Sequence, residues 1–407
     1  MLEDIYPRYH TRFLCLPLLG PHVEAFVIWL RDHGYPRLPI RLRVRALPRV
    51  DEALRRRGIR RIEELTASDL LRLAPKNSQE DIYLAAVVRT LARFFTAQHR
   101  LAQPWVTPRE RLVCAYCDHL ERVRGFAEST RASHGTTAAE LLSFIGFNGN
   151  PSALRTLGPR DIEAFVRAVG TRLCRASLQH TVGHLRSFLR FLESQGLVAS
   201  GLDAIIDTPR VYRGERLPRA LAWETVRGFL AAIDRSTPMG KRDYAMFLLI
   251  ATYGLRTSEV AALRLDHIEW RTERLRVPRA KTNTPLLLPL TEAVGAALID
   301  YIRNARPESG HREVFLRVRA PAGILRATAV TEAFQGWTRR SNLPIPYKGP
   351  HCLRHSLAVH LLRQGASLKA IGDLLGHRSA ESTCVYLRLH VEDLRDVALD
   401  LPPEVYS

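Results

Sequence analysis

The stretch HCLRHSLAVHLLRQGASLKAIGDLLGHRSAESTCVYLRL, residues 351–389, decides the fold of the C-terminal part of the chain. Its apolar residues recur at three- and four-residue spacing, which is typical of helices. Gly376 is expected to end one helix and Ser379 to cap the next, with Tyr386 about two turns along it. A tyrosine in such a place is usually a core residue whose hydroxyl reaches water. Its role therefore depends on its neighbours.

His351 and Arg354 are three residues apart, so on a helix they share a face. His355 follows His351 at the four-residue spacing of a helical metal site, but no Glu lies between them and no third ligand is evident. Cys114 and Cys117 form a C-x-x-C pair that lacks the second pair or the histidines of a zinc site. Because Arg354 is also a poor neighbour for a metal cation, we expect an anion site and no bound metal.

Two more cations precede this stretch. Arg256 follows the turn TYGL and begins the helix RTSEVAAL, where a helix N-terminus favours an anion. The alternative for Arg256 is an ion pair with Glu259 on the same helix. Lys281 stands in PRAKTNTP, which is expected to be the turn between two strands. A lysine at a hairpin tip is usually a solvated surface residue, but a hairpin can also place it in the minor groove beside a cleaved bond.

Taken together, these positions form a set rich in donors and without a carboxylate: Arg256, Lys281, His351, Arg354, His377 and Tyr386. Two guanidiniums can bind the oxygens of a phosphodiester and neutralise the charge that grows in its transition state. A phenol with a pKa near ~10 needs help to attack, and a histidine can accept its proton while a lysine protonates the leaving oxygen. The set predicts a covalent phosphotyrosine formed without a metal or any other cofactor.

These motifs resemble the catalytic domain of the tyrosine recombinases, the phage integrase family. TYGLRTSEVAALRLDHI looks like that family's first arginine box, and residues 351–389 look like its second, with H-x-x-R, L-G-H and a tyrosine nine residues after that histidine. The resemblance spans about residues 219–400. It implies a DNA strand transferase, a site-specific recombinase or integrase that acts in integration, excision or transposition of a mobile element. Its intermediate would be a 3′-phosphotyrosine.

The resemblance also assigns roles around the scissile phosphate. Arg256 and Arg354 would hold this phosphate, and Tyr386 would be the nucleophile. His351 would accept the proton of Tyr386. His377 would hydrogen-bond the phosphate and assist the leaving group. Whether the tyrosine serves its own active site or that of a neighbour stays open.

The general acid is the least regular part of the match. The resemblance assigns this role to Lys281. The hairpin lysine of the family often lies in a Gly-Lys-Gly setting, whereas here the setting is RAKTN. Lys348 is a distant second candidate.

The charge of the chain indicates a polyanionic partner. Lys and Arg number 60 against 41 Asp and Glu, which gives a formal net charge of +19 and a pI near 10.3. Nucleic acid is the commonest polyanion, although an arginine-rich genome would also raise the charge. The N-terminus MLEDIYPRYH has acids where a secretory signal is basic, and no run is apolar enough to span a membrane. We therefore expect a cytoplasmic, nucleoid-associated bacterial protein without a membrane partner.

The patterns divide the chain into two helical regions, residues 1–105 and 108–200, a basic linker at 201–218 and a third domain at 219–407. In the third domain HIEW, RLRVP and LLLPL are short β-type runs, which predicts a three-stranded antiparallel sheet, and EVFLRV is expected to be one more strand. The predicted fold class is mainly α with a small antiparallel β-sheet in the catalytic domain (α+β).

A weak internal repeat connects the two helical regions. LTASD at residues 65–69 matches LGPRD at 157–161, and LARFFTAQ at 91–98 matches LRSFLRFLESQ at 185–195. The second region resembles the family's core-binding domain, so the extra N-terminal region is expected to duplicate that unit. The alternative is a chance similarity between two helical bundles.

The resemblance implies double-stranded DNA recombination sites as partners and self-assembly into a synaptic tetramer on DNA, with partner recombinases or accessory proteins in some members. The length of the chain suggests a transposon-borne member. Residues 391–401 are expected to dock on a neighbouring protomer, the alternative being that they pack on their own domain. Two other functions stay open: a type IB topoisomerase-like nicking and closing enzyme, and a DNA-binding accessory subunit without turnover.

Overall fold

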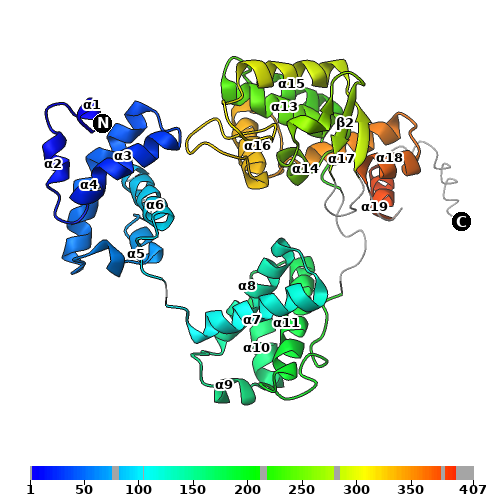
Figure 1. Ribbon diagram of the computed structural model, residues 1–407. Coiled ribbons are helices and arrows are strands. Elements are labelled where there is room, and N and C mark those ends of the chain that lie inside the picture. Colours follow the sequence, from blue (N-terminus) through cyan, green and yellow to red (C-terminus); the bar gives the residue numbers. More distant parts are fainter. Residues whose placement is uncertain are drawn as a thin grey trace, which may run out of the picture. The chain divides into compact units, whose positions relative to one another are not determined.

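The computed structural model describes the chain in segments, which are residues 2–75, 82–103, 105–210, 218–278, 285–376 and 381–390. Two compact units result, one formed by residues 1–65, 69–101 and 216–407 and the other by residues 66–68 and 102–215. Figure 1 follows the chain through both units and shows that helices dominate each of them. The predicted fold class, mainly α with one small antiparallel sheet, is confirmed.

The N-terminal part of the first unit is a group of helices around its own hydrophobic core. Its elements are α1 (Leu2–Ile5), α2 (His10–Leu14), the 3-10 turn η1 (Gly20–His22), α3 (Val23–Asp32), α4 (Arg37–Arg56), the 3-10 turn η2 (Ile62–Glu64), α5 (Ala67–Leu71) and α6 (Ile82–Ala97). Phe26, Leu47 and Phe95 lie in this core. Buried Asp51 accepts hydrogen bonds from the backbone N–H groups of Leu18 and Leu19, which ties α4 to the turn before α3.

The second unit is a separate helical bundle. Its elements are α7 (Pro108–Arg124), α8 (Glu128–Phe144), α9 (Ser152–Arg155), α10 (Pro159–Gly170) and α11 (Arg175–Ser194). Thr107 begins α7 with a reciprocal cap, in which its hydroxyl accepts from the Glu110 amide and its own amide donates to the Glu110 carboxylate. The predicted repeat would pair α5 with α10, but α5 has 5 residues and α10 has 12. Because the two helices differ in length, the repeat stays a prediction.

The C-terminal part of the first unit packs helices against the small sheet. Its elements are α12 (Trp223–Ala231), α13 (Pro238–Tyr253), α14 (Thr257–Ala261), the 3-10 turn η4 (Leu265–His267), β1 (Ile268–Glu269), β2 (Arg274–Val277), β3 (Leu286–Pro289), α15 (Glu292–Asn304), α16 (Ala327–Ser341), α17 (His351–Arg363), α18 (Leu368–Leu375), α19 (Glu381–Cys384) and the 3-10 turn η5 (Val385–His390). The three strands are antiparallel in the order β1-β2-β3. Leu275 pairs with both Ile268 and Leu288, so the sheet turns an apolar row toward the core.

The segment EVFLRV, residues 313–318, is not a strand of this sheet. It makes only isolated bridges, Arg264 to Glu313 and Leu316 to Ile324, among the residues described. Its backbone bonds are divided between loop backbone and side chains. The amide of Val314 donates to the carbonyl of Leu263, the Arg306 guanidinium donates to the carbonyls of residues 313 and 314, and the Tyr301 hydroxyl accepts from the amide of Leu316. The apolar pattern alone could not distinguish these partners from a strand.

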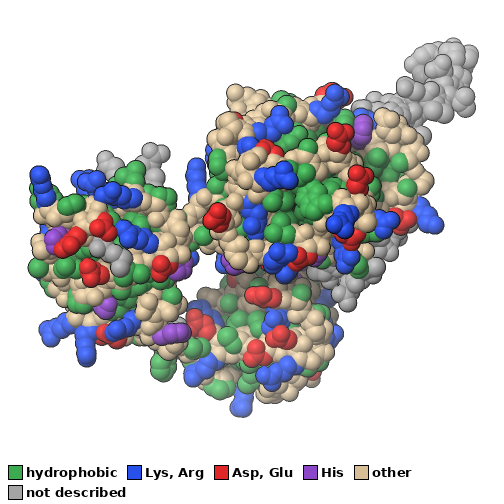
Figure 2. All heavy atoms as spheres, turned by 45° about the horizontal axis from the view of Figure 1, so that its top comes forward, with side chains coloured by type: hydrophobic (Ala, Val, Ile, Leu, Met, Phe, Trp, Pro, Cys, Tyr) green, Lys and Arg blue, Asp and Glu red, His purple; other side chains and the backbone are tan. Residues whose placement is uncertain are grey.

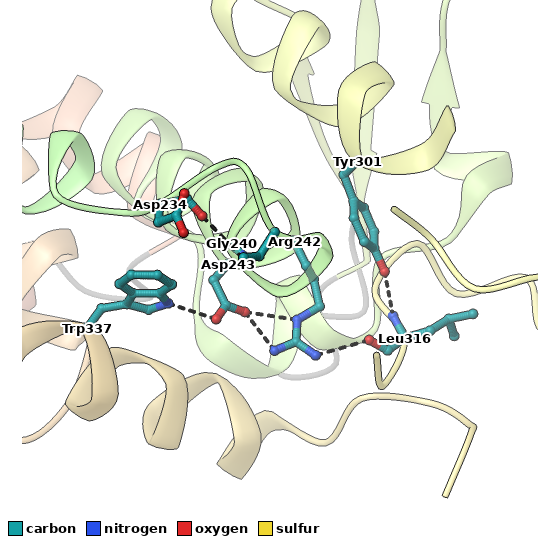
Figure 3. Close-up of polar contacts among 8 residues, drawn as sticks. Asp234, Gly240, Arg242, Asp243, Tyr301, Leu316 and Trp337 are labelled. Atoms are coloured by element: carbon teal, nitrogen blue, oxygen red, sulfur yellow. Dashed lines mark hydrogen bonds and ion pairs between the residues drawn. The ribbon is translucent and has the colours of Figure 1, made fainter. Parts of the chain in front are cut away.

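A buried polar network joins α13 to α16 (Figure 3). Asp243 accepts from the Arg242 guanidinium at 2.9 and 2.7 Å through one carboxylate oxygen and from the Trp337 indole N–H at 2.8 Å through the other. Arg242 also donates to the carbonyl of Leu316. A buried ion pair is tolerated when its remaining polar atoms are hydrogen-bonded, as they are here. The network fixes the first half of α13, the helix whose far end reaches the candidate site.

Figure 2 shows Lys and Arg side chains spread over the face in view, with Asp and Glu side chains between them. This distribution accords with the formal charge of +19. In the part of the chain that the structure describes, no helix is both long enough and apolar enough to cross a lipid bilayer.

Candidate active site

The candidate site forms where the ends of α13 and α18 meet α17. Both helices end in a glycine with a left-handed backbone, Gly254 at φ 65° and Gly376 at φ 64°. A Cβ atom on Gly254 would lie 2.4 Å from the Leu375 side chain, so the two helix ends approach each other closely. The Gly376 turn predicted from the sequence is therefore present.

Arg354 holds these two helix ends together from α17. Its side chain is 2% exposed. One terminal nitrogen donates to the carbonyl of Gly254, and the other donates to the carbonyl of Leu375 at 2.5 Å. Carbonyls at helix C-termini lack intrahelical partners and carry partial negative charge, so they stabilise a buried cation.

Arg256 reaches the same place from the start of α14. Its guanidinium contacts the Glu259 carboxylate at 2.7 Å and donates to the carbonyl of Gly376 at 3.5 Å. The ion pair with Glu259, the alternative considered for this residue, is thus present. It leaves the Arg256 side chain 27% exposed, whereas Glu259 is buried. Arg256 and Arg354 therefore bind the consecutive carbonyls of Gly376 and Leu375 at the end of α18, which brings their positive charges close together.

His351 is the first residue of α17, and its side chain is exposed. Partial desolvation lowers the pKa of His351, and the positive charges of Arg354 and Arg256 lower it further. A histidine with a lowered pKa is neutral near pH 7. It can then accept a proton, which is the role that the resemblance assigns to it.

Tyr386 lies in the same part of the fold, on η5. The sequence predicted an α-helix running from Ser379 past Tyr386, but α19 covers only Glu381–Cys384 and a 3-10 turn carries the tyrosine. Its side chain is 1% exposed and packs with Ala358 and Leu375. Burial raises the pKa of Tyr386, while the charges of Arg354 and Arg256 act in the opposite direction.

His355 also lies in the site, although it is not among the residues that the sequence predicts there. Its Nδ1 lies 3.0 Å from the hydroxyl oxygen of Tyr386. Its ring meets the ring of His351 edge-on, with centroids 4.6 Å apart. The signal in the sequence is its four-residue spacing from His351, which also fits a helical metal motif.

Two predicted site residues, Lys281 and His377, lie outside the described residues. The hairpin that should carry Lys281 is confirmed at its base, because β2 pairs with β3 up to the partners Val277 and Leu286. Lys348 is exposed and precedes α17, and its carbonyl accepts from Gln335. The structure thus brings Arg256, His351, Arg354 and Tyr386 together.

The chemistry of this arrangement is that of an anion site with a nucleophile beside it. Two guanidiniums supply positive charge, a neutral imidazole can accept a proton, and a phenol lies close to both arginines. Among the residues that the structure describes, no cluster of three His, Cys, Asp or Glu side chains could hold a metal ion. The two arginines could stabilise a phosphate transition state through their positive charge.

Comparison with known proteins gives this arrangement a context. Residues 219–393 match the phage integrase family. The integrase/recombinase y4rA of Sinorhizobium fredii is 36% identical to this chain over 325 residues, which cover 78% of this chain and 79% of that protein. The tyrosine recombinase XerD of Lacticaseibacillus casei is 29% identical over 70% of this chain and 95% of that protein.

The fold is also similar to that of a solved recombinase. A crystal structure of the XerH site-specific recombinase bound to its difH substrate matches with a TM-score of 0.53 at 14% identity. The match covers 72% of this chain and 98% of that chain. At this identity the likeness concerns the fold alone.

Proposed function

The chain belongs to the phage integrase family, the tyrosine recombinases, and from that premise we propose that it is a site-specific recombinase that forms a 3′-phosphotyrosine intermediate with DNA. The observation that carries the proposal is the position of Tyr386. Its phenol is buried beside α17, 3.0 Å from His355, and it is close enough to Arg354 and Arg256 for their charges to oppose the rise in its pKa that burial causes. A tyrosine with a purely structural role would not need two cations beside it.

In the proposed reaction, the Tyr386 oxygen attacks the scissile phosphorus, a P–O bond to tyrosine forms, and the bond from phosphorus to the 5′ oxygen breaks. His351 accepts the phenolic proton, and its lowered pKa suits that role. Lys281 returns a proton to the 5′ oxygen, with His377 on the phosphate. A 5′ hydroxyl from another strand then attacks the phosphotyrosine and releases Tyr386, so the strands exchange without ATP.

The proposed chemistry is independent of metal ions because the two arginines perform the task of a metal. Arg256 and Arg354 lie at the end of α18, where their charges can neutralise the non-bridging phosphate oxygens. Cleavage should therefore proceed unchanged in excess chelator.

The proposed partner is double-stranded DNA that carries the ends of a mobile element, within a synaptic tetramer. The charge of +19 supports a long contact with phosphates. The solved XerH site-specific recombinase, which has a similar fold, is bound to its difH substrate. Association with the nucleoid would follow from this charge. A relaxing enzyme of the type IB topoisomerase kind would instead act as a monomer on any duplex.

The first test replaces the nucleophile. Tyr386→Phe removes only the hydroxyl, so the buried ring keeps its apolar contacts while phosphotyrosine formation becomes impossible. We expect the wild-type protein to form a covalent adduct on a nicked duplex from the ends of its element and the variant to form none. Denaturing electrophoresis measures the adduct, and gel-shift titration measures DNA affinity.

Tyr301→Phe is the matched control, because this tyrosine is also buried and hydrogen-bonded but lies away from the site. It should retain adduct formation. An adduct that persists in Tyr386→Phe would overturn the assignment of the nucleophile. A DNA-binding accessory subunit would give no adduct even with the wild-type protein.

A further inference from the structure

The hydroxyl of Tyr386 has a defined partner on α17. His355 Nδ1 lies 3.0 Å from the phenolic oxygen, and the two ring centroids are 5.6 Å apart. His355 is not one of the six residues to which the family resemblance gives a role. It nevertheless touches the atom that would attack the phosphate.

The tyrosine side chain is enclosed by apolar neighbours. Tyr386 is 1% exposed and shares a cluster with Ala358, Val359, Ile371 and Leu375. A buried hydroxyl is directed by the acceptors within its reach, since water does not compete for it. The direction of the Tyr386 hydroxyl therefore depends in part on the position of His355.

The position of His355 is itself set by the firmly held helix α17. The neighbouring Arg354 is tied to the carbonyls of Gly254 and Leu375. Ser356, the residue on its other side, accepts from the amide of Leu221 at 2.7 Å. His351 lies one turn earlier and contacts the ring of His355 edge-on. These contacts fix the position of α17 at His355 and restrict the orientation of its imidazole ring.

We propose that His355 is a positioning residue for the nucleophile, in which Nδ1 accepts the hydrogen bond of the Tyr386 hydroxyl and keeps the phenolic oxygen beside Arg256 and Arg354. This role rests on the proposed function of Tyr386. Acceptance at Nδ1 requires a neutral imidazole that carries its proton on Nε2. His355 thus holds the attacking atom before the reaction, and the phenolic proton leaves this hydrogen bond for His351, the proposed proton acceptor, as the attack begins.

A merely structural histidine would behave differently. If His355 only satisfied a buried hydroxyl, its loss would lower the fraction of folded protein, but folded molecules would cleave at the normal rate. A positioning residue changes the rate constant of folded, DNA-bound protein, because misplacement of a reacting atom slows the chemical step. The structural role and the positioning role can therefore be distinguished by the cleavage rate measured with the DNA saturated by protein.

The test uses the full chain with two substitutions, His355→Asn and His355→Ala. Asparagine keeps an acceptor close to the place of Nδ1, whereas alanine removes it. The measurement is the single-turnover rate of adduct formation on a nicked duplex at saturating protein, with DNA affinity from gel shifts. We expect His355→Ala to slow the reaction at least about tenfold at unchanged affinity and His355→Asn to stay within about threefold of the wild type.

Two results would overturn the proposal. In the first, His355→Ala cleaves at the wild-type rate once DNA is saturated. In the second, the asparagine and alanine variants lose activity equally, which would mean that the acceptor geometry is not what matters. His311→Ala is the control, because this exposed histidine of the same unit lies outside the site. Failure of the proposed function is distinguishable, since the wild-type protein would then form no adduct that depends on Tyr386.

Discussion

At the scale of single residues, Arg354 connects the fold to the chemistry. A buried guanidinium is costly unless its donors are satisfied. Here it binds the carbonyls of Gly254 and Leu375, so the cation is in place before any phosphate arrives. Charge that is fixed in advance stabilises a transition state without reorganisation. The same contacts make Arg354 necessary for the junction of α13 and α18.

Gly254 is the residue that permits this junction. Its backbone is left-handed, and an added Cβ would lie 2.4 Å from Leu375 and 3.5 Å from Arg354. Gly254→Ala should therefore lower the free energy of unfolding by about 1 to 3 kcal/mol and slow adduct formation by displacing Arg354. Urea denaturation and the single-turnover assay measure the two effects.

Gly310→Ala is the control for this prediction, because a Cβ there meets nothing within 4 Å and the backbone is not left-handed. It should leave both quantities unchanged. If Gly254→Ala also left the free energy of unfolding and the rate of adduct formation unchanged, the close approach of the two helix ends would not be required for the site.

The sequence predicted which residues come together in the site better than it predicted their hydrogen-bond partners. The H-x-x-R spacing and the Gly376 turn placed His351, Arg354 and Tyr386 correctly near one another. The bond from Tyr386 to His355 could not be predicted, because it depends on how η5 folds back on α17. Spacing along one helix carries no information about a partner 31 residues away.

At the scale of elements, the two secondary-structure predictions that were wrong have a common cause. The expected strand at residues 313–318 and the expected helix through Tyr386 were both inferred from local periodicity. In the first segment, Arg306, Tyr301 and loop backbone share the hydrogen bonds of the main chain. In the second segment, the buried Tyr386 lies on a 3-10 turn. Tertiary contacts thus decided the outcome where the local signal was short.

The second unit contains a buried polar chain in its core that the proposed mechanism does not use. The Tyr116 hydroxyl lies 2.9 Å from His134 Nδ1, and the rings of His134 and His184 are 4.2 Å apart. Thr137 contacts His184 at 3.3 Å. Burial, followed by the charge of His184, lowers the pKa of His134 to about 4. His134 is therefore neutral in the folded bundle at physiological pH.

This chain should make the bundle sensitive to acid. Between pH 6.5 and about 4, His134 is protonated when unfolded but neutral when folded, so the unfolded state binds more protons and stability falls as pH falls. When the pH falls from 7.5 to 5, His134 should lower the free energy of unfolding by about 2 kcal/mol. Hydrogen exchange of α8 and α11 amides in urea measures it. His134→Gln should reduce the loss, and an unchanged loss would contradict the assignment.

At the scale of the whole molecule, the nucleophile and the arginines belong to one chain. Tyr386 packs with Leu375 and hydrogen-bonds to His355, and the charges of Arg354 and Arg256 oppose the rise in its pKa that burial causes. An enzyme that donated its tyrosine to a neighbour would hold this side chain away from its own arginines. From this arrangement within one chain we predict cleavage in cis, a point that the sequence left open.

Mixing two inactive variants tests cleavage in cis on assembled DNA sites. Tyr386→Phe lacks the nucleophile, and Arg256→Gln lacks a phosphate ligand while keeping an amide that can reach Gly376. In cis, every subunit of the mixture is defective, so adduct formation should stay at the sum of the two separate proteins. In trans, an intact tyrosine could meet an intact arginine pair on a neighbour, and adducts would reappear. Native gel shifts with the two variants made to differ in size show that mixed assemblies form, because mixed assemblies migrate between those of the separate proteins.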